Sequence, residues 1–346
     1  MRIAQVTSIY ISVPPPTHGG TEMVVSYLTE ELVRRGNDVH LYASGDSSTS
    51  GSLHAVIEQA TLDQPSVTLY LDKELEARNS FELYRRGDRY DVIHAHWPVL
   101  APYFAGSTPT PTLMTYHYIE RELHEYYRRE IPSLQPVCVS HKQAELLGEP
   151  SLPVIHNGLD MGLIPFNEHP SDFLVLVARM VPSKGIVEAI NIAKSAGERL
   201  VLIGPVTNYI PWSQTFYREQ VLPHIDGDQV IHLAELPNAQ VLDIVSQAKA
   251  FLFPLQWDEP FGLSMVEAMA CGTPVIAYPR GSVPEIVADG ESGYIVESEQ
   301  DAISALSKVG ELDRRWVRST VESRFNYERM VDAYEALYGH LIDSRS

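Results

Sequence analysis

EPFGLSMVE, residues 259–267, is the most informative stretch of this chain. Its Pro-Phe-Gly turn predicts a loop that contains Glu259, followed by a helix that contains Glu267. Backbone N–H groups at the start of that helix, near residues 261–264, lack intrahelical acceptors and favour an anionic ligand. Two acids that accept hydrogen bonds from hydroxyl groups, beside N–H groups that bind phosphate, suit a sugar nucleotide. The alternative is a surface helix with two solvated acids.

Short β-branched runs alternate with helical patterns along the whole chain, which predicts an α/β protein with parallel sheets. The runs are residues 3–9, 39–43, 91–96, 112–117, 137–140 and 154–156, and then 173–178, 200–203, 230–233, 251–253, 274–277 and 294–296. Glycine and proline interrupt the pattern between the two series and place a boundary near residue 165. We therefore expect two doubly wound domains, residues 1–164 and 165–326, facing an interdomain cleft that binds the ligands.

The composition is that of a globular protein, with 44% hydrophobic and 21% charged residues in 346. No apolar run approaches the roughly 20 residues of a membrane helix, and the first residues enter a strand without a signal-peptide pattern. These features predict a cytoplasmic protein. The formal net charge of −19 argues against nucleic acid and against strong membrane association, so it favours a soluble acceptor.

Arg179 and Lys184 lie five residues apart, just beyond the end of the predicted strand at residues 173–178. Gly185 follows Lys184 directly. Two fixed cations at this place can bind a diphosphate and stabilise the negative charge that develops when it departs from a sugar. The alternative is an ordinary pair of exposed cations near a turn.

Residues 179–185 and 259–267 together resemble the corresponding segments of retaining GT-B glycosyltransferases of family 4, group 1, which have two Rossmann-like domains. The resemblance covers essentially the whole chain and is most specific at residues 178–293. It implies that Arg179 and Lys184 contact the diphosphate, that Glu259 binds hydroxyl groups of the transferred sugar, and that Glu267 binds the ribose. It also implies a nucleotide-binding role for residues at the helix start, namely Gly262, Leu263 and Ser264.

Further residues take their expected roles from the same resemblance. His117, at the end of a predicted strand, corresponds to a histidine that contacts the transferred sugar. The motif HGGTE at residues 18–22 corresponds to a glycine-rich loop over the diphosphate, so Gly19 and Gly20, with Phe261, are assigned to a sugar- and phosphate-binding loop. A loop against the nucleobase is expected at Glu235, Leu236 and Pro237, although Ala234 and Glu235 replace the usual glycine. GSVPE at residues 281–285 either lines the site or serves only as a turn and helix start.

The last helical pattern has apolar residues at Met330, Val331, Tyr334, Leu337 and Leu341. This stripe requires a partner surface. By resemblance, residues 327–346 return to the N-terminal domain.

His94 and His96 project to the same face of a predicted strand, as two metal ligands do. No third ligand follows at a recognisable spacing, and histidines bonded within the fold are the alternative. We expect no metal ion and no separate cofactor.

The function implied by the resemblance is transfer of a hexose from a nucleotide-diphosphate sugar, UDP-linked in the first instance, to a hydroxyl group with retention of configuration. The expected acceptor is a saccharide or natural product. The alternatives are transfer to a lipid or a cell-envelope polysaccharide precursor, a sugar-nucleotide epimerase or glucan phosphorylase, and a non-catalytic sugar-nucleotide sensor or partner subunit. A dehydrogenase is disfavoured, because the Gly-x-Gly-x-x-Gly fingerprint is missing from the first βα turn.

Overall fold

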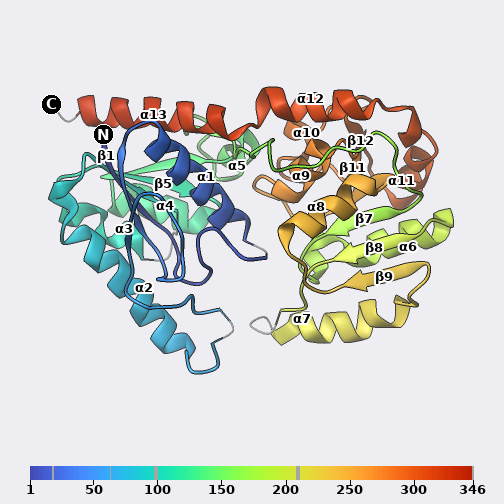
Figure 1. Ribbon diagram of the computed structural model, residues 1–346, viewed down its shortest axis with the longest axis horizontal. Coiled ribbons are helices and arrows are strands. Elements are labelled where there is room, and N and C mark those ends of the chain that lie inside the picture. The colour runs from blue at the N-terminus through green and yellow to red at the C-terminus, as the bar shows by residue number, and fades with distance from the viewer. Residues whose placement is uncertain (18, 63, 97–99, 208–210, 345–346) are drawn as a thin grey trace. The chain divides into compact units, whose positions relative to one another are not determined.

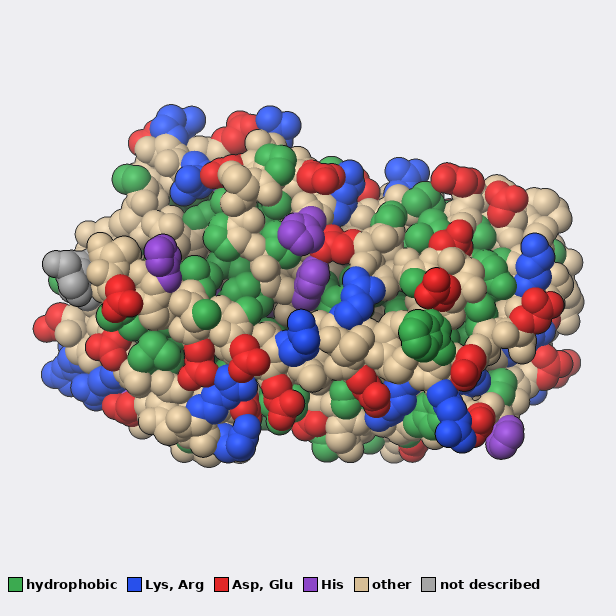
Figure 2. Space-filling view, turned by 90° about the horizontal axis from the view of Figure 1, so that it is seen from above, with side chains coloured by type: hydrophobic (Ala, Val, Ile, Leu, Met, Phe, Trp, Pro, Cys, Tyr) green, Lys and Arg blue, Asp and Glu red, His purple; other side chains and the backbone are tan. Residues whose placement is uncertain are grey.

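The computed structural model describes residues 1–17, 19–62, 64–96, 100–207 and 211–344 (Figure 1). The chain divides into two compact units. The first comprises Met1–Leu159 together with Tyr327–Ser346, and the second is Asp160–Asn326. No helix in the described ranges is both long enough and apolar enough to cross a membrane. On the face shown in Figure 2, basic side chains lie among acidic ones.

The first unit is built on a parallel six-stranded sheet of order β3-β2-β1-β4-β5-β6. Its strands are β1 Arg2–Val6, β2 Asp38–Tyr42, β3 Ser52–His54, β4 Val92–Ala95, β5 Thr112–Tyr116 and β6 Leu134–Cys138. Its helices are α1 Gly20–Arg34, α2 Leu69–Tyr84, α3 Ala101–Phe104, α4 Arg121–Glu130, α5 His141–Leu146 and α13 Tyr327–Asp343.

The second unit repeats this plan with a parallel six-stranded sheet of order β12-β11-β10-β7-β8-β9. Its strands are β7 Leu174–Val177, β8 Leu200–Ile203, β9 Val230–Leu233, β10 Ala250–Phe253, β11 Val275–Ala277 and β12 Gly293–Ile295. Its helices are α6 Ile186–Ala196, α7 Pro211–Phe216, α8 Asn238–Gln247, α9 Leu263–Ala270, α10 Val283–Ile286, α11 Glu299–Leu306 and α12 Arg314–Arg324.

Both sheets have the strand order of a doubly wound Rossmann-like fold. In each, the chain starts at a central strand, builds three strands to one side, and then returns to the centre to build three on the other side. Ligands in such folds bind at the carboxyl ends of the two central strands, where the direction of winding reverses. These places are the ends of β1 and β4 in the first unit and of β7 and β10 in the second.

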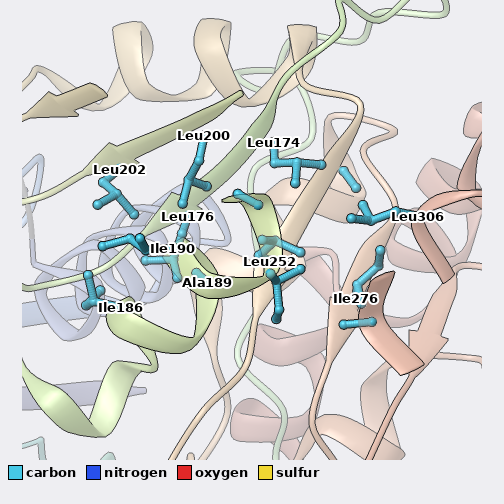
Figure 3. Packing of buried hydrophobic residues seen from close by; sticks show 14 of the residues in the cluster. Leu174, Leu176, Ile186, Ala189, Ile190, Leu200, Leu202, Leu252, Ile276 and Leu306 are labelled. Atoms are coloured by element: carbon cyan, nitrogen blue, oxygen red, sulfur yellow. The ribbon is translucent and has the colours of Figure 1, made fainter. Parts of the chain in front are cut away.

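The core of the second unit explains why its strands were readable as apolar runs. Leu174 and Leu176 of β7 belong to one cluster of hydrophobic side chains with Ile186 and Ile190 of α6, and all four side chains are fully buried (Figure 3). Burial of each such side chain stabilises the fold by about 1.5–3 kcal/mol. Both faces of a parallel sheet are covered by helices, so the intervening Val175 is buried as well.

Helix α13 packs on α1 and β4 of the first unit. Its buried residues are Met330, Val331, Tyr334 and Tyr338. The expected stripe was therefore wrong at its C-terminal end, where Leu337 is half-buried and Tyr338 takes the core position. The tyrosine is accommodated because its hydroxyl finds a partner in His94, at 2.6 Å from Nδ1.

Two other expectations about strands need correction. The short edge strand β3 was not expected, because Ser52–His54 contains a single aliphatic residue and depends on pairing with β2. Residues 154–156 do not extend the sheet as a strand. Val154 forms only an isolated parallel bridge with Cys138 at the end of β6.

Candidate functional site

The loop that follows β10 comes to lie beside the turn that follows β7. Both strands are central and adjacent, so their carboxyl ends meet. Gln256 N donates to Ser183 O at 2.9 Å and joins the two connections directly. Glu259 lies on the first of these connections and Lys184 on the second, in the short 3₁₀ turn Pro182–Lys184.

Lys184, Glu259 and Trp257 form one charged cluster at this place. Lys184 Nζ lies 2.5 Å from Glu259 Oε2, and the same oxygen accepts a hydrogen bond from Trp257 Nε1 at 3.1 Å. The ammonium group also lies 4.6 Å from the centre of the indole ring. The lysine and glutamate side chains are only 14% and 13% exposed, so this pair is shielded from solvent far more than a surface ion pair.

Gly185 permits the close approach of the two connections. Its φ of 70° is left-handed, and a Cβ atom there would lie 2.0 Å from Pro254 O. Only glycine fits both the conformation and the space. The glycine that follows Lys184 in the sequence motif is therefore a packing requirement of the site.

Replacing Gly185 by alanine is expected to destabilise the protein more than replacing Gly197, at the other end of α6. Gly197 has the same φ of 70°, but a Cβ atom added there would meet nothing within 4 Å. Both changes incur the left-handed penalty of about 1–2 kcal/mol, and Gly185→Ala adds an overpacking cost of about 1–3 kcal/mol. Urea unfolding of both variants measures the difference. Equal losses of stability would contradict this account of Gly185.

The GSVPE segment, residues 281–285, is joined to the Glu259 loop by hydrogen bonds. Ser282 N donates to Glu259 O at 3.0 Å, and Gly281 N donates to Asp258 Oδ1 at 2.9 Å. Ser282 Oγ donates to Phe261 O at 2.8 Å. A Cβ atom on Gly281 would lie 2.2 Å from Glu259 O. This segment thus acts on the site through backbone contacts with the loop.

Helix α9 begins directly after this loop, as predicted. Gly262 is its N-cap with a left-handed φ of 79°. No acceptor within the described part of the chain is recorded for the backbone N–H groups of Leu263 and Ser264, which leaves them available to an anion. Phe261 is 3% exposed and packs edge-on against Phe325, so its side chain is a core residue. Any contact of Phe261 with a ligand must come from its backbone.

Glu267 lies on α9 with a half-buried side chain. Its carboxylate accepts no hydrogen bond that is recorded among the described residues, and burial raises its pKa to about 7. A charged carboxylate that is shielded from water and lacks a hydrogen-bond donor destabilises the folded protein. Hydroxyl donors from a ligand would stabilise this charged form.

The raised pKa of Glu267 predicts a dependence of stability on pH. The folded pKa exceeds the unfolded value of 4.5, so the charged form is less stable in the folded protein. Its cost is absent below about pH 4.5 and complete above about pH 7. We expect Glu267→Gln to raise the free energy of unfolding at pH 8 but much less at pH 5. Urea titrations at both pH values measure this, with the exposed Glu291→Gln as control. An equal effect at both values would contradict the prediction.

Arg179 follows β7 by two residues, and its side chain is exposed. No ion pair or hydrogen bond of its guanidinium group is recorded within the described ranges. It is therefore a cation available to an anionic ligand, at the same sheet edge as Lys184.

Glu235, Leu236 and Pro237 lie farther along this edge. They form the connection between β9, an outer strand of the sheet, and α8. Glu235 and Pro237 are exposed and Leu236 is half-buried. They stand at the carboxyl ends of the strands like the other residues, but two strand positions from β7.

In the first unit, Gly19 is the N-cap of α1, with a φ of 148°. A Cβ atom on it would lie 2.8 Å from both Pro15 Cβ and Glu22 Oε2. Gly20 begins the helix. His18 of the same motif lies outside the described residues.

His117 immediately follows β5, and its ring is half-buried. Its Nε2 lies 3.2 Å from His96 Nδ1, and burial lowers its pKa to about 4, so the ring is neutral near pH 7. His96 Nε2 lies 3.2 Å from Gln5 Oε1.

His94, on the same face of β4, is bonded to Tyr338 through Nδ1 and to Thr115 through Nε2. All four ring nitrogens of His94 and His96 therefore have partners within the fold. Of the two interpretations, the structure supports the internal one over metal binding.

Sequence reasoning missed Trp257, which contacts Lys184 and Glu259, and Gln5, which contacts His96 beside His117. Trp257 was overlooked although it stands two positions before Glu259, a spacing at which an indole N–H can reach the carboxylate. Gln5 was overlooked as well. A polar residue in the middle of the buried strand β1 was the available signal, because buried polar groups require partners.

Comparisons with known proteins match nearly the whole chain. The family described as glycosyl transferases group 1 matches residues 165–319, and glycosyltransferase family 4 matches residues 18–163. The chain is 24% identical to N-acetyl-alpha-D-glucosaminyl L-malate synthase of Bacillus anthracis over 367 residues, covering 93% of this chain and 94% of that protein.

Two solved structures have similar folds. Sucrose-phosphate synthase from Thermosynechococcus elongatus matches with a TM-score of 0.79 and 20% identity, covering 99% of each chain. A glycosyltransferase involved in avilamycin A biosynthesis matches with a TM-score of 0.74 and 23% identity, covering 99% of this chain and 98% of that one. These similarities confirm the GT-B fold that the sequence predicted.

Proposed function

Because the chain belongs to the group 1 glycosyltransferases of family 4, we propose that it transfers a hexose from a nucleoside-diphosphate sugar to a hydroxyl group of a small soluble acceptor. The first donor to test is a UDP-hexose. The transfer proceeds with retention of configuration and without a metal ion. The acceptor class comprises saccharides and natural products.

The observation that supports this proposal most directly is the cluster of Lys184, Glu259 and Trp257 at the end of β7 and β10. A largely buried cation and a largely buried carboxylate stand in contact there. The exposed Arg179 and the first N–H groups of α9 lie at the same sheet edge. Cations and N–H groups suit a diphosphate, and the carboxylate suits the hydroxyl groups of a sugar.

In the proposed reaction, the bond between the anomeric carbon and the diphosphate oxygen breaks. A bond from the acceptor oxygen to the same carbon forms on the same face. The acceptor proton passes to an oxygen of the leaving diphosphate. Arg179 and Lys184 stabilise the negative charge that accumulates on the diphosphate, and Glu259 orients the sugar through its hydroxyl groups. Glu267 receives the ribose hydroxyls, and His117 contacts the transferred sugar.

Two considerations support a soluble acceptor and a metal-independent step. The net charge of −19 disfavours docking on anionic lipid surfaces, and the relative from Bacillus anthracis is named for a product of malate, a small acid. Two cations and free backbone N–H groups supply the positive charge that a divalent ion supplies in other transferases.

The proposal is tested by measuring nucleotide release from UDP-, GDP-, ADP- and TDP-sugars with EDTA present. We expect slow release from one donor, accelerated by the correct acceptor and lost in Arg179→Ala. Release that requires added Mg²⁺ would contradict the metal-independent step. Product stereochemistry, read by NMR of the new glycosidic bond, tests retention.

The same assay separates the alternative functions. An epimerase converts the donor sugar without acceptor and without net nucleotide release. A sensor or partner subunit binds one donor but releases nothing with any acceptor. A lipid-specific enzyme releases nucleotide only when a lipid acceptor is supplied, and a phosphorylase requires a glucan and inorganic phosphate. Each of these results would replace the proposed function.

A further inference from the structure

A row of hydrogen-bonded polar side chains runs from α1 through the first sheet to His117. Thr29 Oγ1 donates to Gln5 Oε1 at 3.2 Å, and the same oxygen lies 3.2 Å from His96 Nε2. His96 Nδ1 lies 3.2 Å from His117 Nε2, and the two imidazole rings stack with centroids 5.5 Å apart. Thr29, Gln5 and His96 are at most 1% exposed. The row starts on α1, passes through β1, and ends at residues that directly follow β4 and β5, and its three buried members cannot rearrange as surface side chains do.

The hydrogen-bonding capacities of these groups determine where the protons lie. In the orientation of the Gln5 amide that the structure shows, Oε1 faces His96 Nε2, and because a carbonyl oxygen only accepts, the proton between them is on His96 Nε2. His96 is neutral because burial lowers its pKa well below the usual value, so its Nδ1 has a lone pair. That lone pair accepts the proton of His117 Nε2. His117 is neutral too, and its Nδ1 is left with a lone pair and with no partner recorded among the described residues.

We propose that Gln5 and His96 are positioning residues that hold His117 in the tautomer protonated at Nε2, so that its Nδ1 accepts a hydrogen bond from a hydroxyl group of the bound molecule. The inference rests on the proposed function for the identity of that molecule, a sugar. In this tautomer, His117 recognises a hydroxyl group of the ligand as a hydrogen-bond donor. An acceptor group at the same position in the ligand, such as a carbonyl or a fluorine, would face a lone pair and be rejected.

A second row beside the first provides the matched comparison. Tyr338 OH is bonded to His94 Nδ1, His94 Nε2 to Thr115 Oγ1, and Thr115 Oγ1 to Tyr334 OH at 2.8 Å. His94 is as buried as His96, and their rings are 3.9 Å apart. Among the described residues, no side chain of the second row is recorded in a hydrogen bond with the His117 ring; the contact between Thr115 and His117 is a backbone one, from His117 N to Thr115 O at 3.2 Å. Both rows therefore satisfy buried polar groups of the fold, but only the first row is proposed to orient the His117 ring.

The direct test is ¹⁵N NMR of the histidine rings of the intact, ligand-free protein near pH 7. We expect His117, assigned by its loss in His117→Gln, to show a protonated Nε2 and an unprotonated Nδ1. The reverse tautomer, or an equal mixture, would overturn the inference. This measurement uses no substrate, so its outcome does not depend on whether the proposed function is correct.

Two variants of His96 separate positioning from packing. The amide oxygen of His96→Asn can still accept from His117 Nε2, whereas His96→Leu cannot. We expect the tautomer to be kept in the asparagine variant and to become mixed in the leucine variant. The value of kcat/KM for the donor should fall roughly tenfold more in the leucine variant, the equivalent of one hydrogen bond.

The control is Tyr338→Phe, which cuts the second row and should change neither the tautomer nor kcat/KM by more than a small factor. Equal effects of His96→Asn and His96→Leu would assign His96 to packing only and overturn the proposal. If the tautomer is as expected but no nucleotide sugar reacts, the proposed function is contradicted, whereas the positioning of His117 by Gln5 and His96 is supported.

Discussion

Replacing Glu259 by glutamine is expected to lower kcat/KM by about 10²-fold or more while tightening the binding of a nucleoside diphosphate that has no sugar attached. The two effects have one cause. Lys184 Nζ is held 2.5 Å from the carboxylate, and both side chains are largely buried. Glutamine removes the negative charge and leaves a cation that needs an anion, which the diphosphate provides. Under the proposed function, it also removes the carboxylate that would orient the hydroxyl groups of the sugar.

Calorimetric titration with nucleoside diphosphates, beside initial rates of transfer, measures the two effects of Glu259→Gln. The matched control is Glu198→Gln. Glu198 Oε1 lies 2.5 Å from Lys249 Nζ in the same unit, but at the amino ends of the strands. We expect no change in nucleotide affinity or rate for the control. Weaker binding of the bare diphosphate to Glu259→Gln would show that Glu259 does not compete for Lys184.

Replacing Lys184 by alanine is expected to reduce kcat by about 10²–10³-fold, which is typical for loss of one preorganised group that stabilises charge in a transition state. Lys184 is preorganised in this sense, because the 3₁₀ turn, Gly185 and the Trp257 ring fix its position before any ligand arrives. The variant also leaves Glu259 buried without its cation. We therefore expect a stability loss of about 1–3 kcal/mol in addition to the loss of activity.

Kinetics at saturating donor separates the two consequences of Lys184→Ala, since a folded but catalytically impaired enzyme keeps its donor affinity better than its turnover. Lys249→Ala is the control for the loss of a paired lysine in this unit. Arg179→Ala, which breaks no recorded contact, should reduce activity without reducing stability. A variant Lys184→Ala with normal kcat would exclude Lys184 from the chemistry.

The ion pair with Glu259 also explains how the largely buried Lys184 can remain charged in the protein without a ligand. A lone ammonium group in this position would be strongly penalised by desolvation. Glu259 offsets that penalty in the free protein, and Trp257 adds a cation–π contact. Under the proposed function, the diphosphate would take the place of Glu259 beside Lys184, and the carboxylate would then be free to accept from the sugar hydroxyls. The ion pair would in that case couple recognition of the diphosphate and of the sugar.

The outcome at particular elements shows which parts of the fold the sequence predicts well. β7 to β12 were all expected, because strands covered on both faces appear as apolar runs whose ends are marked by polar or glycine residues. β3 was missed, since its three residues form a strand only through pairing with β2. Residues 154–156 were expected to be a strand, but they form only an isolated bridge with Cys138. A short apolar run gives no information on whether a neighbouring strand is available for pairing.

For the site, local sequence patterns are enough to predict the residue types and the connections on which they lie: Arg179 and Lys184 beyond one strand, Glu259 beyond another, and Glu267 on the following helix. Local spacing suffices for that, because turns and helix starts are local structures. Three contacts become visible only in the folded units: Lys184 pairs with Glu259 across 75 positions, Trp257 contacts both, and Gln5 is linked to His117 through His96. These contacts depend on which strands are neighbours in the sheets, and strand order is set by packing of the whole unit, which no single segment encodes.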